Sequence, residues 1–289
     1  MPCKIITDEL KDEIKNYYCS KPIGFKQLVD KYNLCIPTIS KILKDIPRWD
    51  KHLVYNPELI EDYFENIDTE IKAYFIGLMI ADGNIFSPTD GCSLFTSITL
   101  QKSDKYLLEK FKSELHANNS LSSDGRGCYT MAIRSNRLAN SLSQYGIVPR
   151  KTLNTYLPTN IPDIFMRHVF RGILDGDGNI YVKTLNNNFI YRISYCDTYT
   201  LMYDMSNYLF NKLALSHCSK IYDYQDRNLS EFKLQGFSDV NKFFNWIYSD
   251  INIFLIRKYE KYILFKNLIK ERKINTEINS DIAQGSESL

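Results

Sequence analysis

One segment of this 289-residue chain occurs twice in closely similar form. The first copy, FIGLMIADGNIF, runs from Phe75 to Phe86, and the second, FRGILDGDGNIY, runs from Phe170 to Tyr181. Asp82 and Asp177 hold the same place in the two copies, 95 residues apart. A chain of this length is long enough for two or three compact units. The repeat therefore predicts two similar units, related by a pseudo-two-fold axis.

Small residues lie four positions apart in each copy, at Gly77 and Ala81 and again at Gly172 and Gly176. This spacing puts both small residues on one face of a helix, where two backbones can approach closely. Glycine inside a helix costs roughly 0.5–1 kcal/mol relative to alanine, so Gly77 and Gly172 need a packing reason. We expect the two helices, called the motif helices below, to pack side by side through this face.

Both aspartates are predicted at helix C-termini, where the helix dipole disfavours a negative charge by about 0.3–1 kcal/mol. If the helices pair, Asp82 and Asp177 also repel each other. Divalent cations would remove both penalties, and hard oxygen ligands suit Mg²⁺. Metal-held carboxylates at one seam are suited to phosphodiester hydrolysis. The alternative is that each aspartate only caps a turn before a strand. The glycines that follow them, Gly83 and Gly178, are expected to form left-handed C-terminal helix caps.

The elements around the two copies divide the chain into five parts. Residues 67–158 and 159–274 both read as helix, two strands, helix, two strands, helix. Residues 1–46 are predicted to form a small helical unit, and 47–66 a linker with a lead-in helix. The polar tail, 275–289, is predicted to be disordered.

The small N-terminal unit resembles a helix-turn-helix, because a helix, a short turn and a second helix rich in small polar residues follow one another. Its outward side chains would then contact the DNA major groove: Thr38, Ser40, Lys41 and Lys44. The alternative is a three-helix packing module that makes no DNA contact.

Composition excludes several classes of protein. The net charge is only +2, so any basic surface must be local. No signal peptide and no run of about 18 apolar residues is present, which predicts a cytoplasmic protein without membrane contact. The seven cysteines have no CxxC spacing, and the four histidines have no metal-ligand spacing. Reduced thiols are therefore expected, with neither disulfides nor a zinc site.

The sequences GLMIADG and GILDGDG, preceded by KAYF and RHVF, resemble the LAGLIDADG homing endonucleases in their single-chain form with two motifs. The resemblance covers roughly Tyr63 to Lys270. It implies an α+β fold of two pseudo-symmetric αββαββα halves, whose antiparallel sheets form a saddle over the DNA. It also implies that Asp82 and Asp177 bind the catalytic metal. Whether a backbone group near position 81 is a further metal ligand is left open. Asp175 occupies an earlier, usually structural acid position, where the first copy has Ile80.

The resemblance also implies a lysine late in each half, close to the scissile phosphates. Lys151 and Lys258 fit this place, each preceded by an arginine. Either lysine could stabilise developing charge or help a water lose its proton, and the alternative is a solvated cationic surface. Gln101 resembles a residue that positions water in this family. Its counterpart in the second half would be Cys196 or Asp197, so the second half departs from the family at this position.

DNA readout would come from outward strand residues, because a two-stranded ribbon fits the major groove. A shift of one residue in strand register moves every side chain to the opposite face of the sheet, so several strand residues stay candidates for DNA contact. The candidates are Ser93, Ser97, Thr99, Arg126, Arg134, Lys183, Tyr191, Arg192, Lys220, Tyr222, Gln225 and Lys233.

We therefore expect a monomeric, Mg²⁺-dependent endonuclease that cuts both strands of a long, asymmetric double-stranded DNA target. One alternative is a DNA-binding regulator that does not cleave, and another is an RNA-splicing maturase of the same fold. Self-splicing as an intein is not expected, because no terminal His-Asn pair is present.

Overall fold

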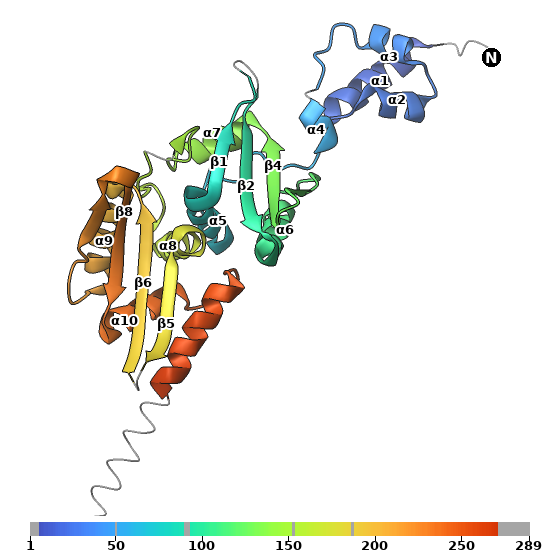
Figure 1. Cartoon of the computed structure of the whole chain (residues 1–289). Helices are drawn as coiled ribbons and strands as arrows, with labels where there is room; N and C mark the ends of the chain where they lie inside the picture. The colour runs from blue at the N-terminus through green and yellow to red at the C-terminus, as the bar shows by residue number, and fades with distance from the viewer. Residues whose placement is uncertain (1–5, 50, 90–92, 152–153, 186–187, 271–289) are drawn as a thin grey trace, which may run out of the picture.

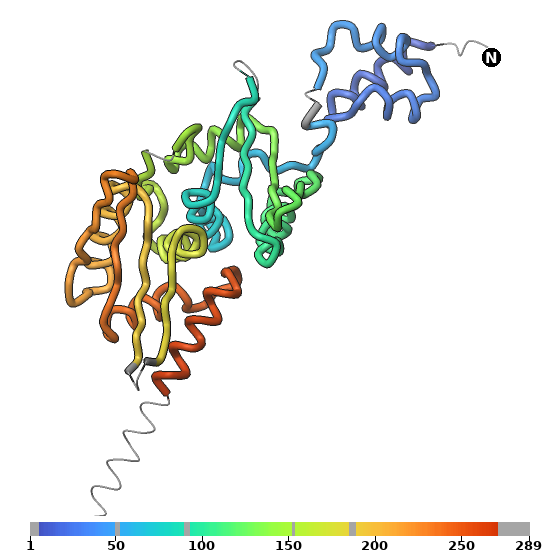
Figure 2. Tube along the Cα trace, in the orientation of Figure 1, coloured from blue at the N-terminus to red at the C-terminus, as the bar shows by residue number. Residues whose placement is uncertain are grey.

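The computed structural model describes residues 6–49, 51–89, 93–151, 154–185 and 188–270. It shows a mixed α+β protein with two similar repeats, beside which lies a small N-terminal helical unit (Figure 1). The two motif helices, α5 and α8, lie between the two sheets, and the tube trace follows the same path (Figure 2). The fold class expected from the sequence is confirmed.

The first repeat follows the predicted order of elements. Its helices and strands are α5 (Glu70–Asp82), β1 (Gly83–Phe86), β2 (Phe95–Gln101), the 3-10 turn η1 (Lys102–Asp104), α6 (Lys105–Glu114), β3 (Ser122–Ser123), β4 (Cys128–Arg134) and α7 (Asn136–Ser143). The strands form an antiparallel sheet in the order β1-β2-β4-β3.

The second repeat has the same order. It consists of α8 (Asp163–Asp177), β5 (Asn179–Leu185), β6 (Asn188–Asp197), α9 (Tyr199–Leu213), β7 (Ile221–Tyr224), the 3-10 turn η3 (Gln225–Arg227), β8 (Leu229–Gln235) and α10 (Phe237–Ile247). Its sheet runs β5-β6-β8-β7, which matches the first sheet strand for strand. A further helix, residues 256–270, follows α10 and packs through the buried Phe265 against Tyr191 of β6.

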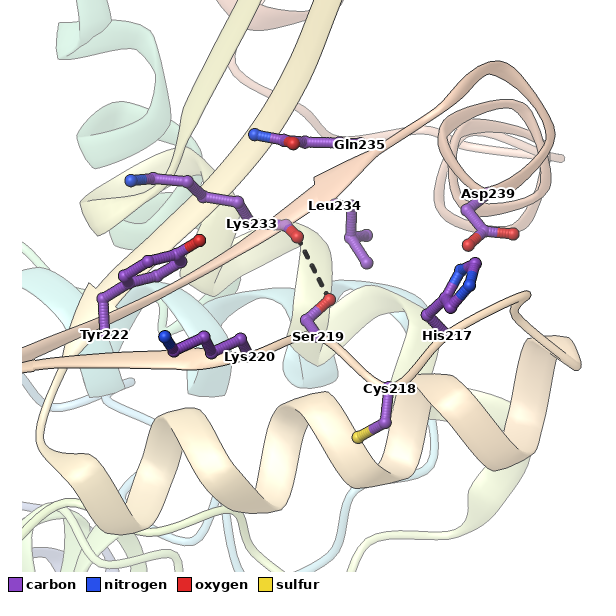
Figure 3. A pocket seen from close by; sticks show the side chains of 9 residues that line it. All are labelled: His217, Cys218, Ser219, Lys220, Tyr222, Lys233, Leu234, Gln235 and Asp239. Carbon is purple, nitrogen blue, oxygen red and sulfur yellow. Dashed lines mark hydrogen bonds between the residues drawn. The ribbon is translucent and has the colours of Figure 1, made fainter.

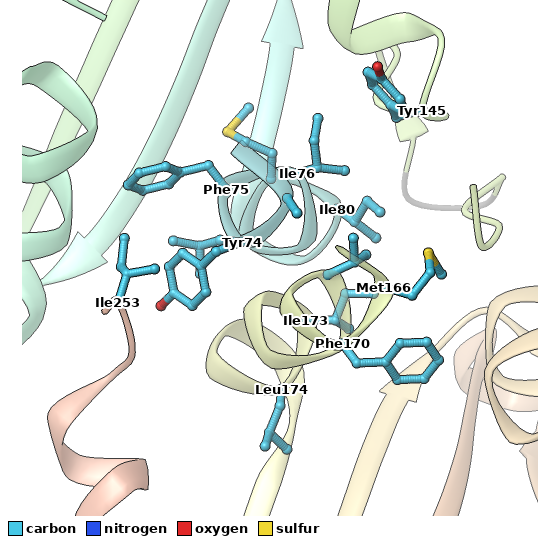
Figure 4. Packing of buried hydrophobic residues seen from close by; sticks show 14 of the residues in the cluster. Tyr74, Phe75, Ile76, Ile80, Tyr145, Met166, Phe170, Ile173, Leu174 and Ile253 are labelled. Carbon is cyan, nitrogen blue, oxygen red and sulfur yellow. The ribbon is translucent and has the colours of Figure 1, made fainter. Parts of the chain in front are cut away.

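The motif helices pack through their glycines, as the spacing predicted. Buried hydrophobic side chains of both helices lie around this contact (Figure 4). A Cβ atom on Gly77 would lie 2.1 Å from the carbonyl oxygen of Val169, and one on Gly172 would lie 2.1 Å from that of Tyr74. Neither position can hold a larger residue unless a backbone moves. The two helices contribute to one continuous hydrophobic core that both repeats share.

The prediction of left-handed caps at Gly83 and Gly178 was wrong. Both residues have extended backbones, with φ of −78° and −86°. Glycine is needed there for space, because a Cβ on Gly83 would lie 2.5 Å from the carbonyl oxygen of Met79. On Gly178 it would lie 2.7 Å from that of Leu174. The chain turns from helix to strand so sharply that no side chain fits.

The N-terminal unit contains α1 (Asp8–Ser20), α2 (Phe25–Tyr32) and α3 (Ile36–Ile42), which enclose a separate hydrophobic core. Trp49 packs on this core, and its indole N–H donates to the carbonyl oxygen of Tyr18 across 2.7 Å. The unit therefore extends beyond the boundary expected at residue 46.

The linker also differs from the expectation. A short helix, α4 (Lys51–Tyr55), lies inside it, whereas residues 58–66 form turns and not the predicted lead-in helix. Tyr63, Phe64 and Ile67 are buried in the core of the repeats. Apolar residues in this stretch thus anchor an irregular segment, although their spacing resembled a helix.

Two expected absences concern only the part of the chain that the structure describes. The five cysteines in those ranges, Cys19, Cys35, Cys128, Cys196 and Cys218, are free thiols. Within the same ranges, no helix combines the length and apolar character that crossing a membrane requires.

Candidate active site and nucleic-acid interface

Asp82 and Asp177 end the two motif helices, and the close packing of those helices brings their carboxylates together. A Cβ on Gly176 of α8 would lie 3.0 Å from the Oδ2 atom of Asp82 in α5. Both aspartates are exposed to solvent. Protein packed around the carboxylate, and next the charge of Asp82, raise the pKa of Asp177 to about 6. Burial also raises the pKa of Asp82, against the opposing effect of nearby ammonium groups.

Lys151 and Lys258 are buried, so the alternative of a solvated cationic surface is excluded. The Lys151 ammonium donates to the carbonyl oxygens of Ile80 (2.5 Å) and Ala81 (3.0 Å), which the end of α5 leaves unpaired. Lys258 lies at the end of α8 and donates to the carbonyl oxygens of Leu174, which also accepts the Gly178 N–H, and of Asp175 (2.8 Å), Gly176 (3.4 Å) and Gly178 (2.6 Å). Burial lowers the pKa of Lys258 to about 8 and lowers that of Lys151 as well. Each lysine places a positive charge at the helix end that carries an aspartate.

Asp175 has a structural environment, unlike its neighbour two residues later. It is buried, and its Oδ2 atom accepts from the Tyr74 hydroxyl (2.9 Å) and the Leu255 N–H (2.8 Å). These bonds tie α8 to α5 and to the segment that precedes Lys258. Burial raises the pKa of Asp175 to about 6.

On the Asp82 side, Gln101 takes part in a chain of hydrogen bonds. Its amide Nε2 donates to Asp104 Oδ2 across 2.8 Å, and the Arg257 Nε donates to the same oxygen across 3.3 Å. Asp104 is buried, and its charge contributes to the raised pKa of Asp82 after burial, the main cause. Sequence reasoning missed Asp104, although it lies only three residues after Gln101.

The Asp177 side has different residues. The strand register aligns Ser97 with Asn84 and Ser194 with Asn179, so the position of Gln101 corresponds to Thr198 in the second repeat. The expected counterparts, Cys196 and Asp197, were therefore wrong by one to two residues. No amide is present at this place.

Asp197 nevertheless lies beside Asp177 and adds, after burial and Asp82, to its raised pKa. Its Oδ1 atom accepts from the Thr155 hydroxyl and from the Thr198 N–H (2.5 Å). No sequence pattern could have found Thr155, because its partner is 42 residues away.

The donor atoms at the seam fit a hard divalent cation. Asp82 and Asp177 are solvent-exposed residues, and their carboxylates lie close enough for the charge of Asp82 to raise the pKa of Asp177. The seam offers a pair of carboxylates, and no group of three or more histidine, cysteine, aspartate or glutamate side chains in the described ranges, the seam included, is arranged to hold a metal ion. A cation would relieve the repulsion that this pair of carboxylates otherwise retains.

The strand registers settle which side chains face away from the core. On the first sheet, Ser97 and Thr99 lie on the outer face, where Ser97 is buried and Thr99 exposed. Arg134 lies on the same face, and its guanidinium donates to Ser93 Oγ across 3.0 Å. Arg126 lies in the exposed turn before β4. This face carries mostly small polar side chains.

The outer face of the second sheet is more basic and more aromatic. Lys183 and Arg192 lie on it, as do Lys220, Tyr222 and Lys233. The prediction for Tyr191 was wrong, because this residue faces the core against Phe237 and Phe265. Gln225 begins the exposed turn η3 at the tip of the sheet.

A hollow of about 220 Å³ lies at the edge of this face, where β7 begins to pair with β8 (Figure 3). Lys220 and Lys233 line it together with Tyr222, and their ammonium groups lie 5.5 and 4.6 Å from the centre of its ring. A salt bridge of 2.8 Å joins Lys233 to Glu231. The two lysines around the hollow, Lys220 and Lys233, extend the basic surface of the second sheet to this edge.

The candidate residues of the N-terminal unit differ in exposure. Lys41 and Lys44 are exposed, whereas Thr38 and Ser40 are half-buried. The Thr38 hydroxyl lies 3.1 Å from Cys35 Sγ at the start of α3. Their contact with DNA stays a prediction.

The sequence matches no protein-family model and no curated protein. Solved structures do match. An alanine mutant of I-SmaMI gives a TM-score of 0.53 at 15% identity, over 70% of this chain and 92% of that chain. I-SmaMI bound to uncleaveable DNA with a TTGT central four gives 0.51 at 17% identity, over 70% and 91%. I-SmaMI bound to an uncleaved DNA target in the presence of calcium ions gives 0.50 at 16% identity, over 70% and 92%.

Proposed function

We propose that this chain, which has the fold of the LAGLIDADG homing endonucleases, is a metal-dependent endonuclease that cleaves both strands of a DNA target. The observation that carries the proposal is the pair of exposed aspartates at the ends of two crossed helices, each helix end capped by a buried lysine. I-SmaMI structures bound to DNA, to which this fold is similar, also support a DNA partner. If the aspartates only stabilised turns, neither repeat would need an exposed aspartate at a helix end together with a buried lysine.

Asp82 and Asp177 would hold Mg²⁺, which when bound supplies an activated water and stabilises the leaving oxygen. Lys151 and Lys258 neutralise the carbonyl-rich helix ends, which favours the ionised form of the aspartates. Gln101 offers an amide that can orient a water on the Asp82 side.

The outer faces of the two sheets would lie along the DNA. Lys183, Arg192, Lys220 and Lys233 would contact phosphates or base edges on one half of the target. Ser97, Thr99 and Arg134 would contact the other half. Since the two faces differ, we propose an asymmetric target bound by a monomer. Thr38, Ser40, Lys41 and Lys44 of the N-terminal unit would extend the contact beside the cut site, with Arg126 at the tip of the first sheet.

Cleaved sites should first be selected from a randomised or host-genome library, which tests catalysis and defines the target. On that target, Asp82→Asn and Asp177→Asn should each reduce cleavage by at least about 100-fold with Mg²⁺, while DNA binding persists. Asp12→Asn, an exposed residue of α1, is the control and should cleave like the parent.

Unchanged cleavage in both aspartate variants would overturn the proposal. Specific DNA binding without cleavage at any Mg²⁺ or Mn²⁺ concentration would favour a regulator. Specific binding of intron RNA in its place would favour a maturase.

A further inference from the structure

We infer that each of the two reaction centres is built from both repeats, with Arg257 positioning groups beside Asp82 and Thr155 positioning groups beside Asp177. The inference rests on the proposed function. Its consequence is that Arg257 and Thr155, neither of which belongs to a motif, affect the cleavage of opposite DNA strands.

Arg257 lies after α10 in the second repeat but contacts the junction between β2 and α6 of the first. Its Nε donates to the buried Asp104 across 3.3 Å, and the same oxygen accepts from Gln101 across 2.8 Å. Ser103 Oγ donates to the other oxygen of Asp104 across 3.0 Å. Through Asp104, Arg257 therefore fixes the Gln101 side chain, which lies on the Asp82 side.

The backbone that carries Arg257 is itself held against the first repeat. The Tyr106 hydroxyl donates to the carbonyl oxygen of Phe254 and accepts from the N–H of Ile256, both across 2.8 Å. Tyr106 belongs to α6, 150 residues before Ile256 in the chain. One hydroxyl thus fixes the turn that presents Arg257 to Asp104.

The Asp177 side shows the reciprocal contact with different chemistry. Thr155 lies after α7 in the first repeat, is buried, and donates through its hydroxyl to Asp197 at the junction of β6 and α9 in the second. Its hydroxyl lies 2.8 Å from that of Thr198, which donates to the Thr155 carbonyl oxygen across 3.0 Å. A neutral hydroxyl here takes the place that a guanidinium holds on the other side.

The test measures the single-turnover rate on each DNA strand separately, with the two 5′ ends labelled differently and Mg²⁺ saturating. Arg257→Gln should slow one strand roughly tenfold, and Thr155→Val should slow the other several-fold, because small misplacements of reacting groups reduce rates strongly. Nicked DNA should accumulate in both variants, with the nick on opposite strands. Tyr106→Phe, which removes one hydroxyl and no charge, should slow the same strand as Arg257→Gln.

Thr155→Ser restores the hydroxyl and should return the strand ratio toward that of the parent. Tyr63→Phe, which removes a hydroxyl that donates to Glu114 far from the seam, should leave the ratio unchanged. A purely structural role predicts equal slowing of both strands, which would overturn the inference, as would slowing of the same strand by Arg257→Gln and Thr155→Val. If the parent protein cuts neither strand, the proposed function itself fails.

Discussion

At three matched positions, α8 carries buried polar side chains where α5 carries buried apolar ones. Counting 95 residues back from each, the pairs are His168 and Ala73, Arg171 and Ile76, and Asp175 and Ile80. The glycines through which the helices pack are nevertheless equivalent, each with a backbone oxygen 2.1 Å from its missing Cβ. The repeats therefore share their packing and differ in their electrostatics.

The polar residues of α8 hold the last part of the chain. The Arg171 guanidinium donates to the carbonyl oxygens of Ile247 (2.7 Å) and Ile253 (2.9 Å) and to Glu70 of α5 (2.7 Å). A fully buried guanidinium is tolerated only when its hydrogen bonds and charge are satisfied in this way. The second repeat therefore has polar anchors for the segment that leads to Lys258 at positions where the first repeat has apolar side chains, while the close contact of the helices is symmetric.

The symmetric part of this comparison gives the largest expected effect. Gly77→Ala and Gly172→Ala should each destabilise the repeats by about 3 kcal/mol, because a methyl group at either place overlaps a backbone oxygen. Urea unfolding followed by circular dichroism measures the loss. Gly24→Ala in the N-terminal unit is a mild control, since its Cβ would meet only side chains, those of Val54 at 3.2 Å and Gln27 at 3.6 Å. Unequal costs at Gly77 and Gly172 would contradict the symmetry of the packing.

The asymmetric part predicts a pH dependence that belongs to α8 alone. Burial, and next the charge of Arg171, lower the pKa of His168 to about 4, against the opposing effect of Glu70. Between pH of about 6.5 and about 4 the unfolded chain therefore binds more protons than the folded one, and stability falls as the pH falls. His168 accounts for up to about 3 kcal/mol of this loss.

Unfolding free energies from pH 7 to pH 4 should show a shallower fall for His168→Gln than for the parent. The difference between the two curves isolates this residue from the carboxylates that also titrate there. His217→Gln, on an exposed loop, should follow the parent curve. Parallel curves for His168→Gln and the parent would show that His168 is not held neutral.

The sheets give the smallest expected effect. Lys183→Ala on the outer face of the second sheet should weaken DNA binding and reduce the slope of log affinity against log salt by about 1, because one phosphate contact is lost. Thr99→Val on the matching face of the first sheet should leave the slope unchanged. Binding titrations at several salt concentrations decide this, and equal slopes for Lys183→Ala and the parent would contradict the basic character of the second face.

Much of the fold could be predicted from the sequence, because its signals are local or repeated. The four-residue spacing of small residues in each copy, Gly77 with Ala81 and Gly172 with Gly176, predicted the interface between the repeats. Alternation along the strands predicted two sheets. The errors arose where a distant group decided the local structure. Gly83 is extended because it already pairs in β1 with Ile98 of β2, and the turns at 58–66 follow from burial of Phe64 in the shared core.

The sequence by itself determined that two aspartates end two paired helices, because a repeated motif fixes both the helix and the position of the acid within it. Only the tertiary structure decided what surrounds each aspartate. Asp104 with Arg257, and Asp197 with Thr155, are pairs separated by 153 and 42 residues. Hydrogen bonds between such pairs leave no periodic signal in a single chain, since they depend on how whole repeats dock. The motif is therefore readable from the sequence, and the difference between its two copies is readable only in the folded protein.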